Sequence, residues 1–248
     1  MAYLGNLYVA GEYSTYFVPM CFKKEIVQSM LPNWLKLVPL PNVAGEVYPV
    51  IFMFGHQKDV RFQWGIFNRF GFDYEEFAVG IPYVQMAKTA QGPFYVMPRL
   101  YLNRLLPVIV GYFWGFAKET ARIQSGKDSY QVKDHKNHLL ISGKFKPCGK
   151  SGKPSDFPFF EEMEKQKMLQ QRPLIDKTFW GSYVCVKFDR DSDQTEIQPV
   201  EANVQIATSF LPGLPIGEYQ VHDINEAPLG AFRMRTPWTM SLPMKCTS

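Results

Sequence analysis

The chain has few cysteines, and they show no paired spacing. Its 248 residues include four, Cys21, Cys148, Cys185 and Cys246, with no Cys-x-x-Cys motif. Such spacing offers neither a disulfide framework nor a zinc site, so we expect no metal and free thiols in a reducing cytoplasm. The N-terminus also lacks the basic start and apolar core of a signal peptide, which agrees with a cytoplasmic location.

Long apolar runs and an excess of charge are lacking as well. The longest uncharged apolar segment, residues 105–117, contains Pro107 and two glycines and is too short to cross a bilayer. The net charge of +4 comes from 27 basic and 23 acidic residues spread along the chain. This spread gives no basic patch for a nucleic acid. We therefore expect a small molecule as the partner, and neither a membrane nor a nucleic acid.

Aromatic residues are abundant, at 15% of the chain, with 20 Phe, 13 Tyr and 5 Trp. Aromatic side chains favour β-strands and also line apolar ligand pockets. The 46% hydrophobic and 20% charged residues are typical of a globular protein. At this length a β-rich chain can form one domain, and we expect a single domain over residues 1–248.

Segments that alternate or are rich in strand formers dominate the chain. The expected strands cover residues 13–22, 35–38, 47–54, 76–87, 92–102, 129–132, 138–146, 183–188 and 200–206. We expect a short helix at 23–30 and a charged surface helix at 156–171. Residues 105–110 fit either a strand or a buried helix, and their periodicity does not decide between the two.

Lys118 is the residue with the most suggestive surroundings. No charged residue lies between Arg104 and Lys118, and the intervening segment includes Phe113, Trp114 and Phe116. A lysine held in an apolar pocket loses hydration, which lowers its pKa, and a neutral amine can form a Schiff base with a carbonyl. The alternative is a lysine that lays its stem on the core and keeps its ammonium in water.

The residues around Lys118 resemble a known signature. Gly115-Phe-Ala-Lys118 is similar to the Gly-(Phe/Tyr)-Pro-Lys motif of the acetoacetate decarboxylase superfamily. The preceding segment, with Pro98 and Leu-Tyr-Leu102, resembles the strand that leads into that motif. Tyr74-Glu-Glu76 resembles the glutamate-bearing strand of the family. The similarity extends over most of the chain.

This resemblance implies an α+β fold, an antiparallel β cone or barrel with a few short helices. It implies Lys118 as the Schiff-base lysine and Glu76 as a general acid or base near the imine. It also implies a keto substrate, no cofactor and a homo-oligomer. The residues expected to contact the substrate are Arg99, Tyr101, Trp114, Phe116 and Glu119.

Several positions depart from the family pattern. Glu119 stands where the decarboxylases have a second lysine, and Ala117 replaces a proline. Tyr13 falls near the place of the arginine that meets a substrate carboxylate. We therefore expect a lyase that decarboxylates a relatively apolar β-keto acid. The alternatives are imine-based aldol, dehydration or cyclisation chemistry on a ketone or aldehyde, and an apolar-ligand-binding protein without catalysis.

Overall fold

The computed structural model describes residues 8–40, 45–63, 68–113, 115–157, 167–171, 183–224 and 229–245. The described strands are β1 (Tyr8–Lys23), β2 (Leu35–Leu37), β3 (Val47–Phe62), β4 (Phe72–Met86), β5 (Phe94–Leu102), β6 (Lys118–Thr120), β7 (Arg122–Ser125), β8 (Ser129–Lys133), β9 (Leu139–Pro147), β10 (Lys167–Gln171), β11 (Tyr183–Val186), β12 (Phe188–Arg190), β13 (Glu196–Ile206), β14 (Gly217–Val221), β15 (Phe232–Ser241) and β16 (Met244–Lys245). The helices are α1 (Lys24–Ser29), α2 (Leu105–Phe113) and a 3-10 turn, η2 (Pro154–Asp156). This β-rich architecture with a few short helices confirms the expected fold class.

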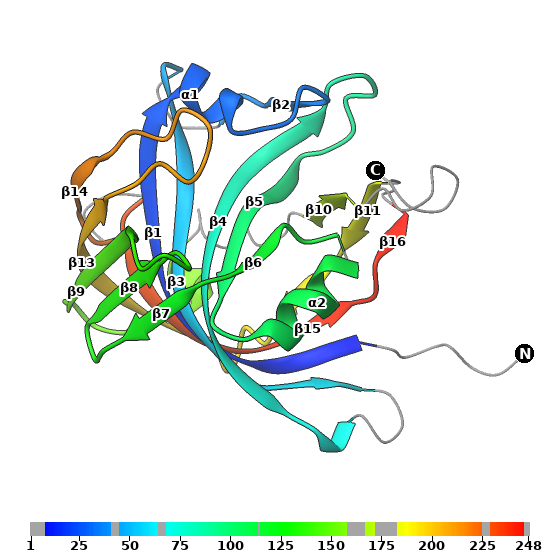
Figure 1. Ribbon diagram of the computed structural model, residues 1–248, viewed down its shortest axis with the longest axis vertical. Helices are drawn as coiled ribbons and strands as arrows, with labels where there is room; N and C mark the ends of the chain where they lie inside the picture. Colours follow the sequence, from blue (N-terminus) through cyan, green and yellow to red (C-terminus); the bar gives the residue numbers. More distant parts are fainter. Residues whose placement is uncertain are drawn as a thin grey trace, which may run out of the picture.

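Long antiparallel strands form the centre of the sheet, in the order β5-β4-β3-β1-β15. Figure 1 shows β1, β3 and β4 bending across the whole molecule. Strand β10 pairs with β5 and β11, and β12 pairs with β15. Because only Lys187 separates β11 from β12, the chain passes directly from the partner of β10 to the partner of β15. The strands thereby nearly close into a barrel.

The two faces of the long strands bury different cores, because successive side chains of a strand point to opposite sides. One side, which we call the barrel interior, buries Phe17, Met53, Ala78, Leu100 and Trp238 together with other apolar residues. The opposite side packs against β8, β9, β13 and β14, which lie together in Figure 1, and forms the outer core.

Residues 105–113 form the helix α2, which settles the ambiguity of the apolar segment. Val108 packs against the barrel interior, whereas Leu105 and Leu106 are 63% and 59% exposed. None of the described helices is long and apolar enough to cross a membrane.

Two expectations from the sequence were wrong. Residues 167–171 form β10 instead of the end of a charged helix, because this segment pairs with β5 and β11 and buries Met168 in the barrel interior. Most of the remaining predicted helix lies outside the described residues. Cys185 is disulfide-bonded, whereas Cys21 and Cys148 are free thiols as expected.

Candidate active site

The backbone around Lys118 is set by the turn that follows α2. The N–H of Phe116 donates to the carbonyl of Gly111 at 3.0 Å, and Gly115 adopts a φ of 89°. This left-handed conformation favours glycine, which accounts for a glycine at position 115. The chain then enters β6, which runs parallel to β5 with Lys118 opposite Leu100. Because Leu100 faces the barrel interior, this register directs Lys118 to the same side.

The amine of Lys118 lies among aromatic rings. Its Nζ is 5.1 Å from the ring centroid of Phe116 and 6.0 Å from that of Tyr74. Burial lowers the pKa of Lys118 below its usual value, and the negative charge of Glu76 partly opposes this shift. A lowered pKa increases the neutral fraction of the amine, which is the nucleophilic form.

Glu76 belongs to the same interior. It follows Tyr74 by two residues on β4, so both side chains point to one face, and Glu76 is only 6% exposed. The side-chain amide of Gln57 donates to Oε1 of Glu76 at 3.4 Å. Glu75 points to the opposite face, where its carboxylate accepts from Ser125 at 2.9 Å. Only one of the two adjacent glutamates therefore lies with Lys118.

Three of the sequence-predicted substrate contacts lie on the opposite side of the strands from Lys118. Tyr101 follows Leu100 on β5 and packs in the outer core. Arg99 forms an ion pair with Glu119, and its guanidinium carbon lies 5.9 Å from the ring centroid of Tyr101. The structure therefore brings Phe116 to Lys118 but separates Arg99, Tyr101 and Glu119 from it. Trp114 lies outside the described residues.

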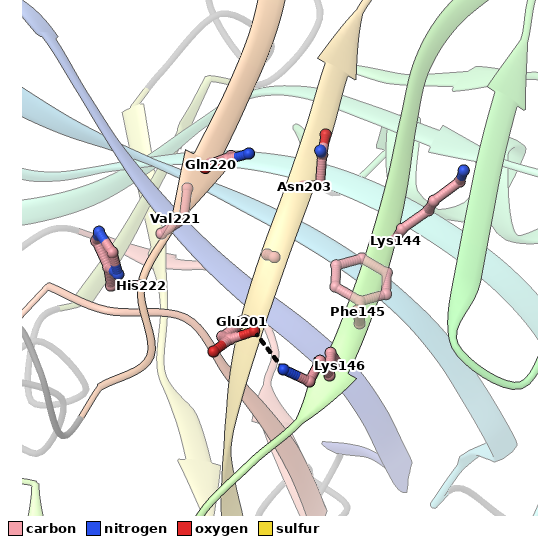
Figure 2. A pocket seen from close by; sticks show the side chains of 9 residues that line it. Lys144, Phe145, Lys146, Glu201, Asn203, Gln220, Val221 and His222 are labelled. Atoms are coloured by element: carbon pink, nitrogen blue, oxygen red, sulfur yellow. Dashed lines mark hydrogen bonds and ion pairs between the residues drawn. The ribbon is translucent and has the colours of Figure 1, made fainter.

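Two pockets formed by described residues lie elsewhere on the molecule. One, of about 420 Å³, is on the outside of β9, β13 and β14, where Lys144, Asn203 and Gln220 surround it (Figure 2). The ion pair between Lys146 and Glu201, at 3.0 Å, borders this pocket. The other, of about 360 Å³, lies between the starts of β4 and α2. Lys118 lines neither pocket.

No family model and no curated protein sequence matches the chain. Solved structures match it in fold. The enduracididine biosynthesis enzyme MppR, complexed with the condensation product of pyruvate and imidazole 4-carboxaldehyde, superposes with a TM-score of 0.65 at 10% identity over 94% of this chain and 86% of that one. The chain has the acetoacetate decarboxylase-like fold. An acetoacetate decarboxylase-like enzyme from Sphingomonas wittichii RW1 gives a TM-score of 0.62 at 13% identity, covering 98% of this chain and 93% of that chain. A structure of acetoacetate decarboxylase gives a TM-score of 0.58 at 10% identity, covering 96% of this chain and 87% of that chain.

Within this acetoacetate decarboxylase-like fold, the barrel interior holds the polar side chain of Tyr13 and two others that the sequence did not single out. Tyr13 is 4% exposed, and burial, followed by the charge of Glu76, raises the pKa of its hydroxyl well above 10. Gln57 and Trp238 are also buried there, and the indole N–H of Trp238 donates to Oε1 of Gln57 at 2.8 Å. No sequence signal marked Gln57 or Trp238, because Gln57 meets Glu76, and Trp238 meets Gln57, only in the folded sheet.

Arg190 is the second group that sequence reasoning missed. Its guanidinium carbon lies 4.8 Å from the ring centroid of Phe188, which in turn stacks on Trp238 at 4.9 Å. Burial lowers the pKa of Arg190 to about 10, so the side chain stays protonated at neutral pH. The positive charge of Arg190 partly opposes the rise in the pKa of Tyr13 that burial and Glu76 cause. The interior therefore contains a guanidinium, although it comes from β12 and not from the N-terminal strand.

Proposed function

We propose that this protein is an enzyme that forms a Schiff base between Lys118 and the ketone of a keto acid. The observation that carries the proposal is the position of the Lys118 amine beside the rings of Tyr74 and Phe116, where burial lowers its pKa. A buried carboxylate, Glu76, shares the same interior and can exchange protons with a bound intermediate.

The proposed reaction is the decarboxylation of a β-keto acid. The neutral amine of Lys118 adds to the ketone carbon, and uptake of a proton from solvent with loss of water gives a protonated imine. The bond to the carboxylate then breaks, CO₂ leaves, and the electron pair moves into the imine to give an enamine. Glu76 takes up a proton from solvent and delivers it to the enamine carbon, and water hydrolyses the resulting protonated imine to release the ketone, the free lysine and a proton.

The substrate that suits this interior is relatively apolar, with one carboxylate. The rings of Tyr74 and Phe116 lie beside the amine of Lys118, and burying apolar groups against them favours binding. An anion in such a site needs a cation nearby, because an unpaired buried carboxylate is costly. We propose Arg190 as the partner of the substrate carboxylate.

Condensation chemistry is the second candidate. It uses the same imine, but the enamine attacks an aldehyde and water is lost, so no CO₂ is formed. The observation that favours it is the match in fold to an enzyme whose structure holds a condensation product. MppR, which has the same fold, was solved with the condensation product of pyruvate and an aldehyde.

The test is borohydride reduction of the protein in the presence of a panel of keto acids and ketones, with mass mapping of the modified peptide. We expect substrate mass on Lys118, and CO₂ release from the acids that are trapped. Trapping without CO₂ would favour condensation, and ligand binding without trapping would make the protein a binding protein. A Lys118→Met variant is the matched negative control, and Lys144→Met controls for the loss of an exposed lysine.

A further inference from the structure

Three buried side chains from three strands form a directed chain of hydrogen bonds in the barrel interior. The indole N–H of Trp238 on β15 donates to Oε1 of Gln57 on β3 at 2.8 Å. Nε2 of Gln57 then donates to Oε1 of Glu76 on β4 at 3.4 Å. Trp238, Gln57 and Glu76 are 4%, 4% and 6% exposed, so water competes little for these groups.

The chemistry of the indole fixes the orientation of the amide. An indole nitrogen can only donate, so the atom of Gln57 that it contacts must be the carbonyl oxygen. The NH₂ group of Gln57 must then point the other way, and there it meets the carboxylate of Glu76. The orientation of a glutamine amide is usually ambiguous in a structure, but here Trp238 resolves it.

We propose that Gln57 is a positioning residue that holds the carboxylate of Glu76 toward Lys118, and that Trp238 locks the amide of Gln57 for this role. The proposal rests on the proposed function, in which Glu76 transfers protons near the Lys118 imine. A carboxylate held by a donor on one oxygen keeps a fixed direction for the other, and misplacement of a catalytic group by about 1 Å can cost about 100-fold in rate.

The hydrogen bonds themselves can be tested without a substrate. In the ¹⁵N-labelled protein, the side-chain NH₂ of Gln57, assigned with Gln57→Leu, should exchange slowly with solvent. Trp238→Phe keeps an aromatic ring against Phe188 but removes the N–H, so the exchange of the Gln57 NH₂ should become at least about tenfold faster. An unchanged exchange rate in Trp238→Phe would contradict the claim that Trp238 fixes the orientation of the Gln57 amide, whether or not the protein forms an imine.

The positioning role is tested with acetone in deuterated water. Proton exchange at the carbons of acetone needs both the imine and a base, whereas borohydride trapping needs only the imine. Gln57→Leu should slow deuterium incorporation by about 10- to 100-fold with trapping at Lys118 unchanged. Gln57→Met, which keeps the length of the side chain but loses the NH₂ donor, should behave alike and covers the case in which the leucine variant fails to fold.

Gln131→Leu is the matched control, because Gln131 is exposed on β8. Deuterium incorporation at the wild-type rate in both Gln57 variants, with trapping intact, would overturn the positioning role. Absence of trapping in the wild-type protein would instead contradict the proposed function, and the NMR measurement would still decide whether Trp238 orients Gln57.

Discussion

Gly111 leaves the space that the side chain of Lys118 occupies. A Cβ atom at position 111 would lie 2.3 Å from Cδ, 2.6 Å from Cε and 2.9 Å from Nζ of the lysine. These distances are shorter than any non-bonded contact between such atoms, so any side chain at this position of α2 displaces the lysine. The absence of a side chain at Gly111 therefore helps to determine the position of the Lys118 amine.

Gly111→Ala should slow the reaction of Lys118 while changing the stability of the fold much less. Alanine favours a helix over glycine by about 0.5–1 kcal/mol, which offsets part of the cost of the clash. The displaced amine should lose at least about tenfold in the rate of imine trapping, since a reacting group must be held close to its productive position. Trapping kinetics and thermal unfolding of the same variant check this.

Gly45→Ala is the control for this substitution, because a Cβ at position 45 meets nothing within 4 Å. Equal trapping rates in Gly111→Ala and the wild type would mean that the side chain of Lys118 can move aside without losing reactivity.

The reactivity of Lys118 should rise with pH through a midpoint below that of an ordinary lysine, because burial lowers its pKa. Glu76 opposes this shift, so Glu76→Gln should move the midpoint further down. Competitive acylation followed by mass mapping measures the midpoint, and exposed lysines of the same sample serve as internal references. A midpoint that moves up in Glu76→Gln would contradict the placement of the carboxylate beside the amine.

The same lowered pKa predicts how stability depends on pH. A lysine with a folded pKa below its unfolded value binds fewer protons when folded, so its contribution to the free energy of unfolding rises with pH until the unfolded pKa is passed. Lys118→Met should remove this part of the pH dependence above neutral pH. Denaturant titrations at several pH values, with Lys144→Met as the control, measure the difference.

The sequence contained enough information to predict the β-rich fold and to propose Lys118 and Glu76 as candidates, because both lie in short segments that resemble a known motif. It did not predict which side of the strands Arg99 and Tyr101 would occupy. That depends on the parallel register of β5 and β6, which sets Lys118 opposite Leu100 and not opposite its neighbours. Local patterns carry no information on such a pairing.

Other parts of the site come from strands that the sequence left unassigned or assigned wrongly. Residues 232–241 alternate between buried and partly exposed positions as β15, but our sequence interpretation gave them no strand. Trp238 therefore had no expected position. Arg190 reads locally as part of a polar turn, and only the pairing of β12 with β15 brings it to the barrel interior.

Glu119→Lys should have little effect on Lys118. The side chain of Glu119 is 51% exposed and pairs with Arg99 on the face opposite to Lys118, so a cation at this position does not reach the amine. Loss of a partly exposed ion pair should destabilise the fold by no more than about 1 kcal/mol. The pH midpoint of Lys118 acylation and the denaturation midpoint measure the two effects. A clear drop in the acylation midpoint would place position 119 next to the amine.

Arg190→Met should weaken the binding of a keto acid more than that of the matching ketone. If the guanidinium meets the substrate carboxylate, its loss leaves a buried charge without a partner, which costs about 2–5 kcal/mol and raises KM for the acid at least tenfold. The ketone lacks the carboxylate, so its binding should weaken by much less. An equal loss for both ligands would assign Arg190 a structural role in the barrel.

Affinity should increase with the length of the apolar chain of the substrate. The amine faces the rings of Tyr74 and Phe116, and the barrel interior around it is lined by apolar side chains. Each buried methylene contributes about 0.8 kcal/mol, or about a fourfold gain in affinity, so four enclosed carbons would add roughly 3 kcal/mol. Titration of a series of β-keto acids and their ketones measures this gain. An affinity that is highest for the four-carbon acid and falls with length would instead indicate a small-acid decarboxylase, in which the charge of the carboxylate outweighs the buried area.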